Sequence, residues 1–188
     1  MFHETEYTDH QAELTFRLTD SPTAQERVLS FLLNEAGEPA TEAEVRDAVD
    51  LPKTTTHVAL TALAEQGVVK AQRVGRTGLY SVDISDPLVR TLKIARAVRR
   101  VQLVVSPLRA EIDLVVLFGS ASCGEDRAGS DVDLFVVARD AERVGSHLAR
   151  HQWLQAVVRT PEAHMRLIAD GGTFATEITR GTAIWERR

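Results

Sequence analysis

The stretch IDLVVLFGSASCGEDRAGSDVDLFVVA, residues 112–138, decides the fold of the C-terminal part of the chain. Its two apolar runs, 112–118 and 131–138, predict buried β-strands, and a loop rich in small residues, 119–129, joins them. Asp131 and Asp133 lie two positions apart on the second run, so both carboxylates project from one face of that strand. Paired carboxylates on one rigid face predict a site for a hard cation, Mg²⁺ or Mn²⁺.

The first of these strands ends at Gly119 and Ser120. A glycine lets the backbone approach a phosphate group, and a serine hydroxyl with nearby amides can bind phosphate oxygens. We therefore expect ATP or another NTP to bind here with Mg²⁺, with Asp131 and Asp133 as metal ligands and catalytic residues. Two surface aspartates beyond an ordinary turn are the alternative, which their apolar flanking residues disfavour because a charge pair beside a buried strand is costly.

Residues 21–84 predict three helices followed by a hairpin. Ser21-Pro22 is typical of a helix N-cap and first helical position, and this first helix should stop near Gly37 and Pro39. Thr41 and Glu44 have the spacing of a capping box, which opens a second helix to about residue 49. A third helix is expected over 53–66, with Gly67 after it and with Val58, Leu60, Leu63 and Ala64 facing inward.

Two alternating segments, 68–74 and 79–84, follow the third helix, and four residues, 75–78, with Gly at both ends join them as a hairpin. The order of helices and hairpin predicts a winged helix-turn-helix, whose third helix enters the major groove of double-stranded DNA and whose hairpin contacts flanking phosphates. A helical domain used only for dimerisation is the alternative. The candidate DNA-binding residues are Lys53, Thr54, Thr55, Thr56 and His57 on the helix and Lys70, Arg73 and Arg76 on the hairpin.

A long helix should begin at Asp86-Pro87 and end at Ser106-Pro107. Six basic residues and no acidic one lie between Arg90 and Arg109, so this helix either extends the DNA footprint, covers a partner, or presents a solvated face. Beyond the second apolar strand we expect a helix near 141–151, a strand near 153–159, a helix opening at 160–162, and a terminal helix and strand. A short strand over 13–19 is also expected.

Composition places the chain among globular proteins and does not exclude a DNA partner. It has 188 residues, 44% of them apolar and 26% charged, with one cysteine, which excludes a disulfide framework. The acidic N-terminus has no apolar core of a signal peptide, so we expect a cytoplasmic protein without a membrane span. The net charge of −5 is unevenly spread: residues 1–50 hold twelve acids and three Arg, and the remainder holds 19 basic and 15 acidic residues.

The segment TTTHVALTALAEQGVV, residues 54–69, resembles the recognition helix and following turn of winged-helix bacterial regulators. The chain from about residue 112 resembles the polymerase-beta-type nucleotidyltransferases, closest to the minimal nucleotidyltransferases of bacteria and archaea. The resemblance implies an α+β chain whose C-terminal domain has a mixed sheet, and it adds Ser130 to the nucleotide-binding residues. The matching residues are Gly119-Ser120, Gly124, Ser130-Asp131 and Asp133-Leu134.

Two departures from that family bear on activity. The family usually has a third carboxylate on the next strand, which completes the metal site, and Gln155 stands there in this chain. An amide oxygen carries no charge and cannot act as a general base. Cys123 stands where the family often has a basic residue, and we expect Arg127 to contact phosphate in its place. Another acid that reaches the site, Glu177 or Glu111, would favour an active enzyme.

The predicted organisation is an acidic N-terminal segment (1–20), a winged helix-turn-helix domain (21–85), a basic connector helix (86–109) and a nucleotidyltransferase-like domain (110–188). From this organisation we expect a homodimeric DNA-binding transcriptional regulator that binds NTP with Mg²⁺ and has reduced or no transferase activity. The alternative is an active nucleotidyltransferase that transfers AMP or another nucleotidyl group to a partner protein or a small molecule. The resemblance implies one such partner, since relatives act as antitoxins that adenylylate a HEPN-type toxin.

Overall fold

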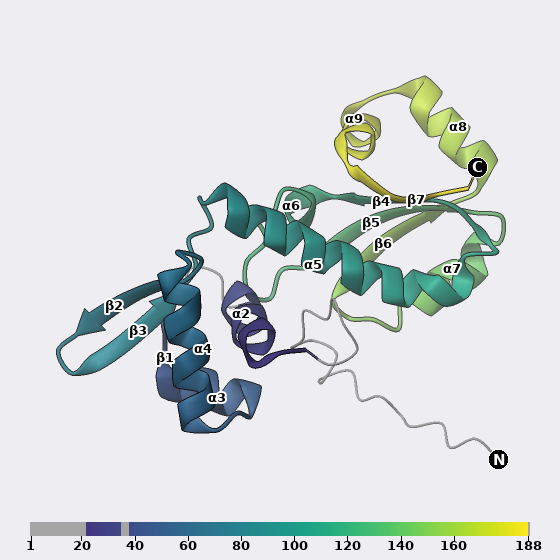
Figure 1. The fold of residues 1–188 in the computed structure, drawn as a ribbon. Coiled ribbons are helices and arrows are strands. Elements are labelled where there is room, and N and C mark those ends of the chain that lie inside the picture. The colour runs from purple at the N-terminus through teal and green to yellow at the C-terminus, as the bar shows by residue number, and fades with distance from the viewer. Residues whose placement is uncertain (1–21, 35–37, 188) are drawn as a thin grey trace, which may run out of the picture. The chain divides into compact units, whose positions relative to one another are not determined.

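The computed structural model describes residues 22–34 and 38–187, which form two compact units, one up to Val89 and one from Arg90 onward. The acidic segment 1–20, the strand expected at 13–19, Ser21 and Gly37 lie outside the described residues. The chain is mixed helix and sheet, as the predicted α+β class requires. Figure 1 shows the order of the elements along the chain.

Among the described residues of the first unit, three helices form its body: α2 (Ala24–Asn34), α3 (Glu42–Val49) and α4 (Lys53–Glu65). The expected start of α2 at Pro22 is wrong. Thr23 caps this helix, because the Glu26 amide donates to its hydroxyl (3.2 Å) and its own amide donates to the Glu26 carboxylate (2.6 Å). The capping box that opens α3 is confirmed at Thr41 and Glu44.

The inward face of α4 differs from the expected one at positions 56 and 58, and Ala64, expected to face inward, is half-buried. Leu60 and Leu63 are buried as expected, but Val58 is 60% exposed and Thr56 is fully buried. The buried residues 56, 59, 60 and 63 follow the three- and four-residue spacing of one helical face, and 58 lies off it. The prediction that Val58 faces inward, made from its hydrophobicity, is therefore wrong, and the spacing of the buried residues places Val58 on the outer surface.

A small antiparallel sheet completes the first unit, with strand order β1-β3-β2. Its strands are β1 (Ala40–Thr41), β2 (Lys70–Val74) and β3 (Thr77–Ser81). Val74 pairs directly with Thr77, so the hairpin connection is the two residues Gly75-Arg76 and not the four expected. Gly75 has a φ of +61°, which glycine adopts without strain and which a two-residue hairpin needs.

The second unit is a four-stranded mixed sheet with helices on both faces (Figure 1). The strand order is β6-β5-β4-β7, in which β5 and β6 are parallel and the other pairs are antiparallel. In chain order, its elements are α5 (Pro87–Val105), a 3-10 turn (Ser106–Leu108), β4 (Ile112–Phe118), α6 (Gly119–Ser122), β5 (Val132–Ala138), α7 (Ala141–Leu148), β6 (Leu154–Arg159), α8 (Pro161–Asp170), α9 (Thr173–Arg180) and β7 (Thr182–Glu186).

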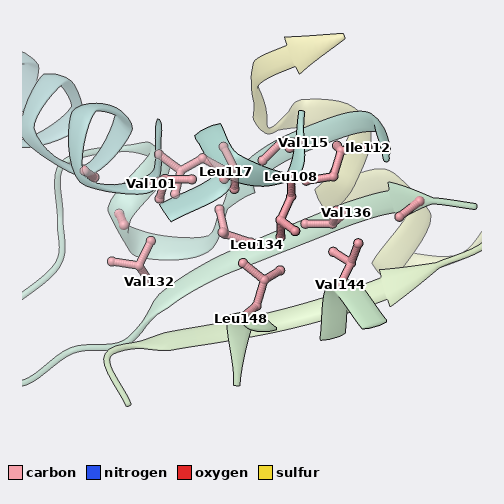
Figure 2. Packing of buried hydrophobic residues seen from close by; sticks show 14 residues of the cluster. Val101, Leu108, Ile112, Val115, Leu117, Val132, Leu134, Val136, Val144 and Leu148 are labelled. Carbon is pink, nitrogen blue, oxygen red and sulfur yellow. The ribbon is translucent and has the colours of Figure 1, made fainter. Parts of the chain in front are cut away.

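One face of this sheet packs against α5 and α7 around a large apolar core (Figure 2). Leu134 and Val136 of β5 meet Val101 of α5 and Leu148 of α7 there. The opposite face carries a smaller cluster around Phe135, with side chains from α8 and α9 against it. Because side chains alternate along a strand, Asp133 projects on the same face as Phe135.

Among the described residues, no helix is long and apolar enough to cross a membrane.

The corrected face of α4 makes a matched pair of stability predictions. Leu60→Ala should lower the free energy of unfolding by about 2–5 kcal/mol, because it leaves a cavity in the core. Val58→Ala should change it by no more than about 0.5 kcal/mol, because the side chain already lies at the surface. Denaturant unfolding of both variants measures the difference, and equal losses would contradict the orientation of α4.

Candidate nucleotide site and nucleic-acid interface

The contact between Gly119 and the Asp133 carboxylate is the centre of the candidate nucleotide site. Phe118, the last residue of β4, pairs with Asp133 on β5, and the chain turns at Gly119 with a φ of +66°. A Cβ at position 119 would collide with Asp133 Oδ2 and lie 3.2 Å from its Cγ. Only glycine fits both the left-handed conformation and this approach to the carboxylate.

The two aspartates differ in environment. Asp131 is exposed and directly precedes β5, which begins at Val132, so the expectation that both lie within the strand is wrong by one residue. Asp133 is half-buried. Burial raises the pKa of Asp133 above its usual value, and the negative charges of Asp131 and Glu177 raise it further. Both neighbouring acids therefore lie close enough for their charges to act on Asp133.

The other predicted phosphate contacts lie in the β4–β5 connection, residues 119–131, and their side chains are exposed. The carbonyl of Ser120 accepts from the Cys123 and Glu125 amides at 3.1 and 3.0 Å, which folds the connection back after α6. Ser130 Oγ accepts from the Arg127 amide at 3.0 Å, and the Ser130 amide donates to the Arg127 carbonyl at 2.9 Å. This reciprocal pair holds the turn that leads into Asp131.

Gln155 lies beside Asp133. The parallel register of β5 and β6 pairs these two residues, so their side chains leave the sheet on the same face. Gln155 is exposed there. Its position is the one at which the family resemblance led us to expect the third carboxylate.

The two acids named as possible substitutes have different surroundings. Glu177 lies on α9, one turn after Phe174, whose ring packs 5.7 Å from that of Phe118. Its charge acts on Asp133. Glu111 is 3.2 Å from Arg143 and precedes β4 at the opposite end of that strand. Glu177 is therefore the acid that the fold brings toward the site.

The donor set fits a metal ion that a nucleotide brings with it. In residues 22–34 and 38–187, no three His, Cys, Asp or Glu side chains gather closely enough to hold a metal by themselves. Mg²⁺ is usually held by one or two carboxylates together with substrate phosphates and water. Burial is the main cause of the raised pKa of Asp133, and the negative charges of Asp131 and Glu177 add to it; a cation would relieve that repulsion.

Sequence reasoning missed the basic residues that anchor the β4–β5 connection to α5. Lys93 has a fully buried side chain, and its ammonium donates to the Asp126 main-chain carbonyl and lies 3.4 Å from Asp126 Oδ1. At Lys93 none of the three interpretations left open for the basic residues of this helix holds, because the side chain is neither at a DNA or partner surface nor solvated. The spacing could have revealed it, because Lys93 lies four residues before Ala97, which belongs with Val101 and Val105 to the buried stripe of α5.

The exposed start of α4 forms one part of the candidate nucleic-acid interface. Lys53, Thr54 and His57 are exposed, and His57 Nδ1 lies 3.0 Å from a Glu42 carboxylate oxygen. Thr56 is buried and donates to the Pro52 carbonyl at 3.1 Å, so it faces the unit's interior. Thr54 and Thr55 line a mostly apolar cavity of about 280 Å³ that they share with Ala24, Gln25, Val58 and Ala59.

The hairpin provides the second part. Arg73 on β2 and Arg76 in the turn are exposed. Lys70 lies at the far end of β2, 2.6 Å from Asp83, and its hydrogen bond is the largest of the interactions that hold the pKa of Asp83 well below its usual value. Arg73 and Arg76 are therefore better placed than Lys70 to meet phosphates at the hairpin tip.

Because the pKa of Asp133 is raised, removal of its carboxylate should stabilise the protein by an amount that depends on pH. A carboxyl group whose pKa is higher in the folded than in the unfolded state destabilises the fold when it is ionised. This loss of stability begins as pH rises above the pKa of the unfolded state, about 3.9, and is complete above the pKa of the folded state. Without divalent cations, Asp133→Asn should therefore raise the midpoint of thermal unfolding at pH 7, and the gain should shrink as pH falls toward 4. A lower midpoint at pH 7 would contradict the assigned environment.

Comparison with known families divides the chain into two matched segments. Residues 27–73 match the IclR helix-turn-helix domain, and residues 105–188 match the model described as polymerase beta, nucleotidyltransferase. Searches of curated proteins and of solved structures gave no match. Both matched segments agree with the elements found here: α2 to β2 in the first, and the mixed sheet in the second. The two matches confirm the predicted combination of a helix-turn-helix segment with a nucleotidyltransferase-like segment.

Proposed function

We propose that this chain is a cytoplasmic, homodimeric transcription regulator that binds double-stranded DNA through its helix-turn-helix and NTP with Mg²⁺ through its nucleotidyltransferase domain. The contact of Gly119 with Asp133 carries the nucleotide part of the proposal. At this contact, a backbone segment that a phosphate can approach lies next to a carboxylate that a metal can bind. Binding of a nucleotide would then affect the binding of DNA by the same chain.

Three kinds of group would hold the nucleotide. Asp131 and Asp133 would be the protein ligands of the metal, which neutralises charge on the phosphates and orients them. The Ser120 and Ser130 hydroxyls would donate to phosphate oxygens from the two ends of the β4–β5 connection. Arg127, exposed in the same connection, would supply a positive charge.

DNA binding is supported by the exposed basic and hydroxyl groups of the first unit. No side chain caps the N-terminus of α4, whose N-cap is Pro52, so no cap occupies its first amides. These amides, with Lys53 and Thr54, suit a phosphate of the DNA backbone. Arg73 and Arg76 would contact phosphates flanking the groove.

The same site supports weak or absent transfer chemistry. In-line transfer needs the attacking hydroxyl to lose its proton, which a carboxylate beside the metal promotes. We infer that Gln155 takes the place of that carboxylate, because it pairs with Asp133 in register. An amide does not accept a proton at neutral pH. The proposal therefore assigns this domain a sensing role.

An active nucleotidyltransferase is the second candidate, and the position of Glu177 favours it. Glu177 acts electrostatically on Asp133, so it is the acid that would supply a third carboxylate to the metal. The acceptor would then be a partner protein, for which a HEPN-type toxin is one candidate, or a small molecule.

Calorimetry with ATP and Mg²⁺ tests the nucleotide site. Wild-type protein should bind ATP only when Mg²⁺ is present, and Asp133→Ala should abolish binding because it removes the principal metal ligand. Asp113→Ala, an acid of β4 that pairs with Arg187 at 3.1 Å, is the matched control and should retain affinity. Equal affinity of the wild type and Asp133→Ala would refute the site.

Label transfer from α-³²P-ATP separates the two candidates. The sensing role predicts little transfer by the wild type and a gain in Gln155→Glu, because the added carboxylate supplies the missing base. Gln152→Glu, an exposed neighbour just before β6, controls for added charge. Strong wild-type transfer that Glu177→Gln abolishes would instead establish the enzyme.

A salt titration tests the DNA interface. On a duplex selected from a random library by the wild type, the double variant Arg73→Ala/Arg76→Ala should bind more weakly, and its salt slope should fall by about 1.8, at about 0.9 per lost phosphate contact. Arg139→Ala/Arg143→Ala, which removes two exposed cations of the second unit, is the control. Unchanged slope and affinity in the hairpin variant would remove the hairpin from the interface.

A further inference from the structure

The buried cations of α5 have no role in the function proposed so far. Lys93 has 0% side-chain exposure and Arg96 has 14%, yet both reach the same acid, Asp126, which is 13% exposed. Arg96 lies 3.9 Å from Asp126 Oδ2. Burial of a charge is costly unless it is paired, and burial lowers the pKa of both Lys93 and Arg96. Packing of α5 alone does not explain why two cationic side chains are buried on this helix.

The acid that these cations hold belongs to the β4–β5 connection, midway between the two halves of the candidate nucleotide site. Asp126 follows α6, which contains Ser120, and directly precedes Arg127. Arg127 begins the turn that Ser130 closes just before Asp131. Fixing Asp126 therefore fixes both flanks of the connection at once.

The backbone of the connection also lies directly on α5. Gly124 has a φ of +68°, and a Cβ there would collide with the Arg90 carbonyl and lie 2.7 Å from Arg90 Cα. Farther along the same helix, the Arg100 guanidinium lies 3.6 Å from the centre of the Trp153 ring, and the Trp153 carbonyl accepts from Val132 at 2.9 Å. The helix thus contacts the connection and also supports the start of β5 through Trp153.

We propose that Lys93 and Arg96 are positioning residues, which hold Asp126 so that the β4–β5 connection is preformed for the phosphates of NTP and Mg²⁺. The inference rests on the proposed nucleotide site. Two cationic side chains face one carboxylate, so the formal charges of this cluster sum to a positive value behind the connection, which would also favour an anionic ligand on its outer side. Neither cation touches the nucleotide; both act through Asp126.

The test compares two neighbouring acids. Asp126→Asn removes the buried partner of Lys93, whereas Glu125→Gln removes an exposed acid that lies 3.3 Å from Arg90. In calorimetry on the full chain, Asp126→Asn should weaken ATP affinity in Mg²⁺ by about tenfold or more, the range found when residues supporting metal ligands are removed. Glu125→Gln should stay near the wild type. Equal effects of the two substitutions would overturn the proposal.

A double variant separates positioning from folding stability. Asp126→Asn leaves the Lys93 charge buried without its carboxylate, and adding Lys93→Met removes that charge while keeping an apolar side chain on the stripe. The double variant should recover the unfolding midpoint but not the ATP affinity. Recovery of both together would show a merely structural role and would overturn the proposal.

Amide hydrogen exchange without nucleotide distinguishes failure of this inference from failure of the proposed function. Residues 119–131 should exchange faster in Asp126→Asn than in Glu125→Gln, with the core of β5 unchanged. Unchanged exchange of the connection would overturn the positioning role even if ATP binds. Absence of ATP binding by the wild type, with faster exchange in Asp126→Asn, would instead overturn the proposed nucleotide site and leave the anchoring of the connection standing.

Discussion

The register between β4 and β5 is the constraint on which the candidate site depends. It places Phe118 opposite Asp133, so that the turn at Gly119 brings the backbone onto the carboxylate. A shift of one residue would send Asp133 to the other face of the sheet, into the apolar core that Leu134 and Val136 form with α5. Asp133 is the one residue of β5 that is not apolar, so burial of its charge in that core opposes the shift. The same pattern that builds the core therefore holds the acid at the site.

Anchoring of the β4–β5 connection is the second requirement, and α5 provides it. An exposed segment with several glycines would cost conformational entropy to order around a ligand. The connection is instead ordered when the protein folds. Asp126 contacts Lys93 and Arg96, and Gly124 contacts the α5 backbone. Binding energy from the phosphates is then available for affinity, as in other preorganised sites. The helix that continues from the first unit is thus also part of the support of the candidate site.

Local patterns predicted the elements well, and three-dimensional contacts accounted for most of the differences. The apolar run 112–118 and the capping box at Thr41 appear as expected, because both depend on neighbours in sequence. Val58 was assigned to the core from its hydrophobicity, although the spacing of Leu60 and Leu63 places it outside. The burial of Lys93 was not predicted, because its partner, Asp126, is 33 residues away in the sequence. The approach of Glu177 to Asp133 depends on how α9 packs, which the sequence pattern does not specify.

A structure with a non-hydrolysable ATP analogue and Mn²⁺ tests the central claim most directly, because the anomalous signal of Mn²⁺ locates the metal independently of the protein atoms. The account predicts a metal peak ligated by the carboxylates of Asp131 and Asp133, with the analogue's phosphates on the backbone from Gly119 to Ser120 and near Arg127. A nucleotide bound with its metal elsewhere, or phosphates that do not contact the β4–β5 connection, would contradict it.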